Sequence, residues 1–277
     1  MTANTFGTLD ILMKHSKEDN LAKFLPDSLL VPSSHTQEIP LSSLSFSMRW
    51  LATIHPSWIA IAMKELPKEI QSQLLACLPE TLVRELLPSL PNVTVAQKRC
   101  SNFGAFYLLN MLNEKLRPKG IVEEVFLPAS TINAILYYSG PTKISVINCL
   151  GLCYLAKELK NVVDKVVLER VKKLLSSTEK LFLTYCQSHP MKNLETTNFL
   201  SSWDQDSELH QFIHIQGLRF LGKALVKEDA SFLWYFLRRL DIRRGYIFEQ
   251  ALKESYGHSY VDYYKNNLER CLKVLIQ

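Results

Sequence analysis

The chain has 277 residues, of which 47% are hydrophobic and 21% are charged, an ordinary balance for a soluble globular protein. A chain of this length buries a core without help from disulfides or metal, and its nine glycines with plentiful Leu, Ile and Lys favour helices over strands and turns. The net charge of +5 permits an acidic partner but is weaker than the clustered charge of a dedicated nucleic-acid binder.

The cysteines and the apolar runs point to a reducing, cytoplasmic environment. None of the six cysteines forms a CxxC pair, and Cys77, Cys149 and Cys153 lie in apolar runs, where a thiol behaves as a small hydrophobe. The first 20 residues lack the apolar core of a leader peptide. The most apolar stretch, 146–156, is too short to span a bilayer. We therefore expect a cytoplasmic protein without a disulfide framework.

The chain begins with a mixed segment that is followed by a proline-containing linker. Residues 1–40 combine one short helical pattern with Pro26, Pro32 and Pro40 and a Ser/Thr/His cluster. We expect an N-terminal segment and an extended linker here.

The next segment, 41–96, repeats leucine followed by proline at 66–67, 78–79 and 90–91. Its apolar residues recur at i, i+4, i+5 and i+8, and each set lies twelve residues after the previous one. In one continuous helix, twelve residues would rotate the apolar face by roughly 120°. Since proline disfavours helix in the residue before it, the pattern predicts three short helices that share a core, with Pro67 and Pro79 at first helical positions. The alternative is one kinked amphipathic helix.

The central region, 97–200, is expected to be helical throughout most of its length. The pattern predicts a helix ending near Leu116, a further helix closed by Gly140 and Pro141, and a long amphipathic helix over 145–176 that contains a break. That last helix fits a core-facing role better than a coiled coil or a partner-binding helix. A polar loop over 188–208 leads to the last part of the chain.

The C-terminal part, 201–277, is again helical, and no segment alternates as a strand does. We therefore expect an all-α protein, in which armadillo-like short-helix repeats are followed by a helical bundle. The expected divisions are 1–40, 41–96, 97–200 and 201–277.

Two pairs of metal-ligating side chains stand at helical i, i+4 spacing. His210 and His214 follow three acidic residues, and imidazoles so placed can hold zinc, although no HExxH motif is present and a helix dipole also explains the acids. Cys149 and Cys153 lie in an apolar run that favours core packing over metal or redox chemistry. A metalloprotein or enzyme around the histidines remains one alternative.

Four arginines form the clearest charged cluster. Arg238, Arg239, Arg243 and Arg244 are expected on one side of a helix end or turn, where they would bind phosphate or an acidic protein surface. A solvated helix end is the structural alternative. A protein partner is favoured over nucleic acid, and a basic nucleic-acid-binding protein remains the second alternative.

No nucleotide-binding or hydrolase motif occurs, since the chain contains no P-loop, GxGxxG or GxSxG sequence. We therefore expect no enzyme, no catalytic residue, no cofactor and no metal.

Two segments resemble one family. The stretch 50–91, with His55 and Pro56 at its first corner, resembles the middle domain of the bacterial flagellar rotor-switch protein of the FliG type. There a Glu-His-Pro-Gln motif opens a helix; here Ile54 and Ser57 replace its outer residues. The segment 208–257, with Leu-Gly-Lys-Ala-Leu over 221–225, resembles the recurrent Leu-Ala-Lys-Ala-Leu helix of the same family.

This resemblance implies a non-enzymatic scaffold. In the family, the His-Pro region docks the next ring protein, and a late charged helix meets the stator; the charges of that helix are mostly absent here. By analogy, the chain is similar to the SctK-type accessory protein of a type III secretion sorting platform. The implied partners are inner-membrane-ring and cytoplasmic-ring proteins within a hetero-oligomer at the cytoplasmic face of the inner membrane. The expected protein-binding residues, listed together, are His55, Pro56, Ser57, Trp58, Arg238, Arg239, Arg243 and Arg244.

Overall fold

The structure, a computed structural model, describes residues 51, 53–97, 100–128, 130, 132–191, 194–195, 197–254 and 257–276. The expected N-terminal segment and linker lie outside these residues. All regular elements among the described residues are helices, so the prediction of an all-α protein is confirmed. The armadillo-like arrangement of the short helices stays a prediction.

The chain forms two compact units. Among the described residues, unit 1 comprises Leu51, Thr53 and those from Ile59 to Arg117, and unit 2 comprises Ile54–Trp58 and those from Pro118 onward. The units therefore divide the chain after residue 117, whereas the sequence suggested divisions near 96 and 200.

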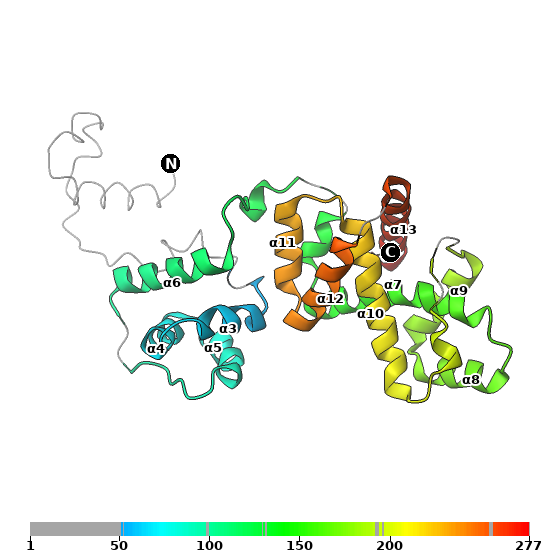
Figure 1. The fold of residues 1–277 in the computed structure, drawn as a ribbon, viewed down its shortest axis with the longest axis horizontal. Coiled ribbons are helices and arrows are strands. Elements are labelled where there is room, and N and C mark those ends of the chain that lie inside the picture. Colours follow the sequence, from blue (N-terminus) through cyan, green and yellow to red (C-terminus); the bar gives the residue numbers. More distant parts are fainter. Residues whose placement is uncertain are drawn as a thin grey trace. The chain divides into compact units, whose positions relative to one another are not determined.

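The short helices of unit 1 follow the proline pattern. They are α3 (Pro56–Lys64), α4 (Lys68–Cys77) and α5 (Glu80–Leu86), followed by the 3-10 turn η4 (Leu87–Ser89) and by α6 (Asn102–Leu116) (Figure 1). The prediction of three short helices is confirmed, and the single kinked helix is wrong.

Pro67 and Pro79 are each one position earlier than expected. Both lie at the N-cap, with ψ angles of 148° and 142° that turn the chain before the first helical residue. The break comes from the extended backbone of the proline itself, and Glu69 and Glu80 then occupy the first turns, where the helix dipole favours an acid.

These turns let the apolar sets face one core. Ile59, Met63, Leu74, Leu86 and Leu112 are all within 1% of complete burial. At 25 cal/mol per Å² of buried apolar surface, side chains of this size each contribute about 2 kcal/mol, which offsets much of the ordering cost of such short helices.

Unit 2 is a helical bundle with α10 (Asp206–Leu225) at its centre. Helix α10 packs against α7 (Gly140–Leu159), α12 (Ile242–Lys253) and α13 (His258–Ile276), and α9 (Ser177–Ser188) packs on α7 (Figure 1). The remaining elements are η5 (Glu124–Phe126), η6 (Asn133–Tyr137), α8 (Lys165–Leu174), η7 (Phe199–Ser201) and α11 (Ala230–Arg239).

The contact between α7 and α10 depends on two glycines. A Cβ atom added at Gly151 would lie 1.8 Å from the backbone oxygen of Ile213, and one added at Gly217 would lie 1.8 Å from that of Ile147. Each helix thus presents a glycine to the backbone of the other, so the two helices approach more closely than side chains permit.

Three expectations about the central region need correction or refinement. Gly140 and Pro141 begin α7 instead of ending a helix, because Ser139 caps this N-terminus through a hydrogen bond from the Thr142 N–H. The break in the long helix lies after Leu159, and Asp164 caps the second part. The residues around this break do not all face a core, since the side chain of Val163 is 92% exposed.

The polar loop after α9 is attached to the bundle by a buried carboxylate. Glu158 on α7 accepts hydrogen bonds from the Thr197 N–H (2.7 Å), the Thr197 hydroxyl (3.0 Å) and the Asn198 N–H (2.9 Å). The loop is thereby held against α7. Among the described residues, no helix combines the length and apolar character needed to cross a membrane.

Candidate protein-binding surface

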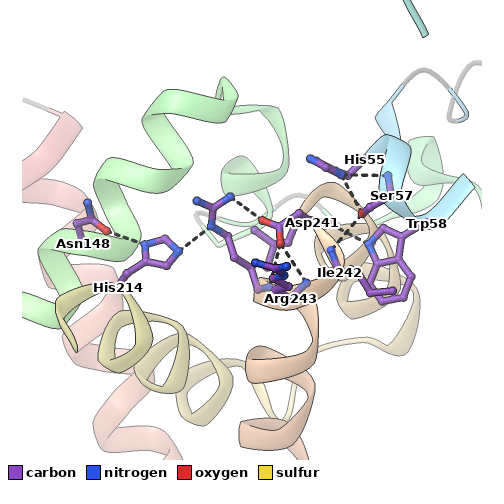
Figure 2. A network of polar contacts seen from close by, with 10 residues as sticks. His55, Ser57, Trp58, Asn148, His214, Asp241, Ile242 and Arg243 are labelled. Carbon is purple, nitrogen blue, oxygen red and sulfur yellow. Dashed lines mark hydrogen bonds and ion pairs between the residues drawn. The ribbon is translucent and has the colours of Figure 1, made fainter. Parts of the chain in front are cut away.

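The His-Pro corner belongs to unit 2, where it lies on the turn between α11 and α12. The His55 N–H donates to the Arg238 carbonyl (2.8 Å), and the Ser57 hydroxyl accepts from the Ile242 N–H (3.1 Å). The Trp58 indole N–H donates to the Leu240 carbonyl (2.8 Å). Figure 2 shows the side chains of His55, Ser57 and Trp58 next to Ile242. The corner therefore satisfies backbone groups at the end of one helix and the start of the next.

Trp58 is packed inside unit 2 and is only half-exposed. The guanidinium of Arg238 lies 4.0 Å from its ring centroid, within the range of a cation–π contact. A Cβ added at Gly245 in α12 would come within 2.7 Å of a Trp58 ring carbon. Arg238 and α12 thus cover part of the indole, and the role of Trp58 as a protein-binding residue stays a prediction.

The four arginines lie on both sides of the turn between α11 and α12. Arg238 and Arg239 end α11, where the dipole favours cations, but Arg243 and Arg244 lie in the first turn of α12, where it does not. Asp241 compensates as the α12 N-cap: its carboxylate accepts from the N–H groups of Arg243 (3.0 Å) and Arg244 (3.2 Å).

Asp241 also accepts from the Arg244 guanidinium at 2.6 Å. Burial acts to raise the pKa of the Asp241 carboxyl, but the Arg244 N–H and guanidinium and the Arg243 N–H together hold this pKa below its usual value. The charged groups in the first turn of α12 thus bond mainly to one another. Of the four arginines, Arg243 is the exposed one.

His214 connects this network to α7. Arg244 donates from Nε to His214 Nε2 (2.8 Å), and since a guanidinium only donates, the imidazole proton is on Nδ1, 2.8 Å from the Asn148 amide oxygen (Figure 2). Burial, and then the charge of Arg244, lower the pKa of His214. His214 is therefore a neutral bridge between α12 and α7.

The structure does not bring a third ligand to the histidine pair. His210 is exposed while His214 is half-buried, and no group of three or more His, Cys, Asp or Glu side chains suited to a metal occurs among the described residues. The i, i+4 spacing reflects one exposed residue and one that bridges helices.

The second segment of the family resemblance, 208–257, covers most of α10 together with α11 and α12, and its Leu-Gly-Lys-Ala-Leu sequence lies in the buried part of α10. Lys223, within the Leu-Gly-Lys-Ala-Leu sequence, is 4% exposed, and its ammonium lies 3.3 Å from the Glu195 carboxylate and 5.6 Å from the Tyr264 ring centroid. Lys223 therefore serves the packing of α10 against α13, while Gly222 lies against Ala251 of α12.

One stripe of α11 holds a segment that the sequence did not single out. Ser231, Tyr235 and Arg239 lie at i, i+4 and i+8 of this helix. The Ser231 hydroxyl accepts from the Val122 N–H (3.2 Å), and the Tyr235 hydroxyl donates to the Val122 carbonyl (3.0 Å). Segment 122–126 is thereby aligned along α11.

Arg239 completes this stripe by joining the two 3-10 turns. Its guanidinium donates to the Leu136 carbonyl in η6 (2.8 Å) and to the Glu124 carboxylate in η5 (2.6 Å), and its side chain is only 7% exposed. The pair is sheltered from solvent, so water and salt screen its attraction less than that of a surface ion pair. Arg239 is a structural residue of unit 2.

The turns that Arg239 joins present large apolar side chains to solvent. The exposed side chains, which we call the η5–η6 patch, are Val122 (46%), Val125 (70%), Phe126 (72%) and Tyr137 (70%). Sequence periodicity could not identify the patch, because 3-10 turns of three to five residues are too short to show a face. Its support on α11 is visible only in the fold.

Comparisons with protein-family models, curated proteins and solved structures give no significant match. The class of this protein must therefore be argued from its own residues.

Proposed function

We propose that this protein is a non-enzymatic adaptor that binds other proteins within the cytoplasmic complex of a bacterial type III secretion or flagellar-type system. The η5–η6 patch supports the adaptor role best. Its apolar side chains are exposed at 46 to 72%, yet their backbone is tied to α11 by Ser231, Tyr235 and Arg239. A preordered apolar surface loses little entropy on binding.

The composition of the patch is that of an interface centre. Phe and Tyr are enriched at the centres of protein interfaces, and charged groups are depleted there. Of the two acidic residues between Val122 and Val125, Glu124 is turned inward to Arg239 and its side chain is 19% exposed, whereas Glu123 is half-buried beside the patch. The patch thus presents rings and aliphatic groups without a competing charge from Glu124.

The choice of system depends on the resemblance of segments 50–91 and 208–257 to the FliG-type rotor protein. The expected partners are ring proteins of such a system, and the chain would act at the cytoplasmic face of the membrane through them. The His-Pro corner contributes by fixing the α11–α12 turn, and Arg243 with the 61%-exposed Tyr246 forms an additional exposed surface on α12.

The test is co-purification of the full chain with cytoplasmic-ring and inner-membrane-ring proteins from the type III secretion system of the same genome. Replacement of Val125 and Phe126 by Ser removes two exposed apolar groups and should reduce capture at least tenfold. The matched control replaces Val163 and Val166, which are 92% and 72% exposed on another part of unit 2.

Three results bear on the proposal. Capture that falls only in the Val125/Phe126 variant supports it. Equal capture by wild type and both variants contradicts a role for the η5–η6 patch, and absence of capture by the wild-type chain contradicts the assignment to this system. Circular dichroism of each variant checks that the helices are retained.

A further inference from the structure

Two cysteines of unit 1 lie side by side although they are distant in sequence. The sulfur atoms of Cys77 and Cys100 are 3.6 Å apart and lie 23 positions apart along the chain. Cys77 is the last residue of α4, and Cys100 immediately precedes Ser101, the N-cap of α6. A disulfide has an S–S distance of about 2.05 Å, so the two sulfur atoms must approach by about 1.5 Å for the bond to form.

The segment before Cys100 contacts α4 through Thr94 and Ala96. The Ser72 hydroxyl donates to the Thr94 carbonyl (2.6 Å), and the Ala96 N–H donates to the Ser72 carbonyl (3.2 Å), so the chain that leads to Cys100 is attached to α4. At Gly104, an added Cβ would lie 3.2 Å from Cys100 Cβ. Gly104 therefore leaves the space in which the Cys100 side chain lies.

Reagents can reach the pair. Both cysteines are half-buried and line a cleft of about 430 Å³, together with Ala76, Pro79 and Asn102 among others. A peroxide or a small dithiol fits into a cleft of this size.

A second cysteine pair, in unit 2, has a similar distance between its sulfur atoms but is not accessible to reagents. The sulfur atoms of Cys153 and Cys186 are 3.5 Å apart, but both residues are buried and the neighbouring void measures only about 10 Å³, the space of one water. Hydrogen bonds with Cys186 and Cys271, and burial, hold the pKa of Cys153 well above its usual value. Since the thiolate is the reactive form, this pair is inert in the folded protein.

We propose that Cys77 and Cys100 form a reversible disulfide that links the end of α4 to the start of α6 in response to a peroxide. One thiol loses its proton and its sulfur attacks a peroxide oxygen; the O–O bond breaks, a sulfenic acid forms, and the leaving oxygen takes up the proton and departs as water, or as an alcohol from an organic peroxide. The second thiol attacks the sulfenic sulfur, the S–S bond forms, and a water molecule leaves. Two thiols are oxidised while one peroxide is reduced, and a dithiol reverses the change by exchange.

The link would close a loop that contains α5 and η4. For a loop of 23 positions, the lost entropy of the unfolded chain raises the ratio of folded to unfolded protein by about 300-fold. Oxidation should therefore stabilise unit 1 without a change in its helix content.

The experiment treats the folded full chain with hydrogen peroxide at low molar excess and maps disulfides by non-reducing peptide mass spectrometry. The expected result is a Cys77–Cys100 cross-link with a loss of two hydrogens, reversed by dithiothreitol, and no Cys153–Cys186 cross-link. Cys100→Ser should abolish the cross-link and the rise in denaturation midpoint, while the matched control Cys153→Ser should keep both.

Alkylation of the wild-type chain by iodoacetamide tests access without any variant: Cys77 and Cys100 should be modified before the pair in unit 2. The proposal is overturned if peroxide gives only sulfinic acid or intermolecular dimers at Cys100. It is also overturned if both pairs oxidise equally, since burial would then not be what distinguishes them.

Discussion

The crossing of α7 and α10 gives the sharpest stability prediction. In Gly217→Ala, the new Cβ would lie 1.8 Å from the Ile147 carbonyl oxygen. A carbon and a carbonyl oxygen approach to about 3.3 Å, so the helices must separate locally by about 1.5 Å. A gap of 0.5 to 1 Å already removes about a quarter to a half of the dispersion energy of each atom pair across the interface.

The expected cost follows from that separation. A buried aliphatic side chain makes about 40 to 60 atomic contacts of roughly 0.1 to 0.2 kcal/mol each, so losing a quarter of these contacts costs about 1 to 3 kcal/mol per residue. Several buried residues, including Ile147 and Ile213, line this crossing. Alanine has a higher helix propensity than glycine, which offsets about 1 kcal/mol of this cost. We expect the free energy of unfolding to fall by about 3 to 4 kcal/mol.

Urea denaturation followed by circular dichroism measures this change. The control is Gly140→Ala, because a Cβ at Gly140 meets nothing within 4 Å; its stability should change by less than about 1 kcal/mol. Gly151→Ala should resemble Gly217→Ala. The double variant should cost less than the two single costs combined, because one separation of the helices accommodates both methyl groups. Strict additivity, or a Gly217 variant as stable as the control, would refute the reasoning.

Three further predictions concern polar contacts of unit 2. Trp58→Phe keeps a ring but leaves the Leu240 carbonyl without its indole donor, so urea denaturation should show a loss of about 1 kcal/mol. The pKa of His214 is lowered, so the folded state binds a proton at this residue more weakly than the unfolded state does, and the free energy of unfolding should fall as pH drops below about 6.5. In His214→Gln the new side chain can still accept a hydrogen bond from Arg244 but does not titrate, so a pH series of denaturation curves should show a weaker dependence on pH. Burial lowers the pKa of Lys143 to about 8, which means that the buried ammonium destabilises the folded state. Lys143→Met should therefore raise the free energy of unfolding by about 1 to 2 kcal/mol at pH 7. This gain should shrink above pH 8, where the folded lysine becomes neutral, and calorimetry at several pH values measures it.

Each polar prediction has a result that contradicts it. An unchanged midpoint for Trp58→Phe would mean that the indole bond contributes nothing. A pH dependence that survives in His214→Gln would assign it to other groups, and destabilisation by Lys143→Met would mean that the ammonium of this residue is well solvated or well paired.

The α3 to α5 region shows how far local rules extend. Proline fixes its own φ and lacks a donor, and these properties act through the nearest residues. The breaks before Lys68 and Glu80 were therefore predictable, as was the sharing of a core by short apolar faces. The exact N-cap position was missed by one residue, which is the usual precision of helix boundaries.

The candidate site was predicted only in part, because its contacts join residues that are far apart along the chain. The four arginines look alike in sequence, yet Arg238 stacks on Trp58, Arg239 joins two turns, and Arg244 contacts His214. Arg243 remains exposed. No local pattern distinguishes these roles, since each depends on a partner more than 20 residues away or on the burial that surrounds it.

The sequence by itself determined the all-helical class, the three short helices and the apolar character of α7 and α10, because helix periodicity and proline geometry act within a few residues. Only the tertiary structure decided which surfaces remain exposed. It packed Trp58 inward, presented Phe126 outward and brought Cys77 next to Cys100, because burial and side-chain proximity are set by packing between segments that the chain separates.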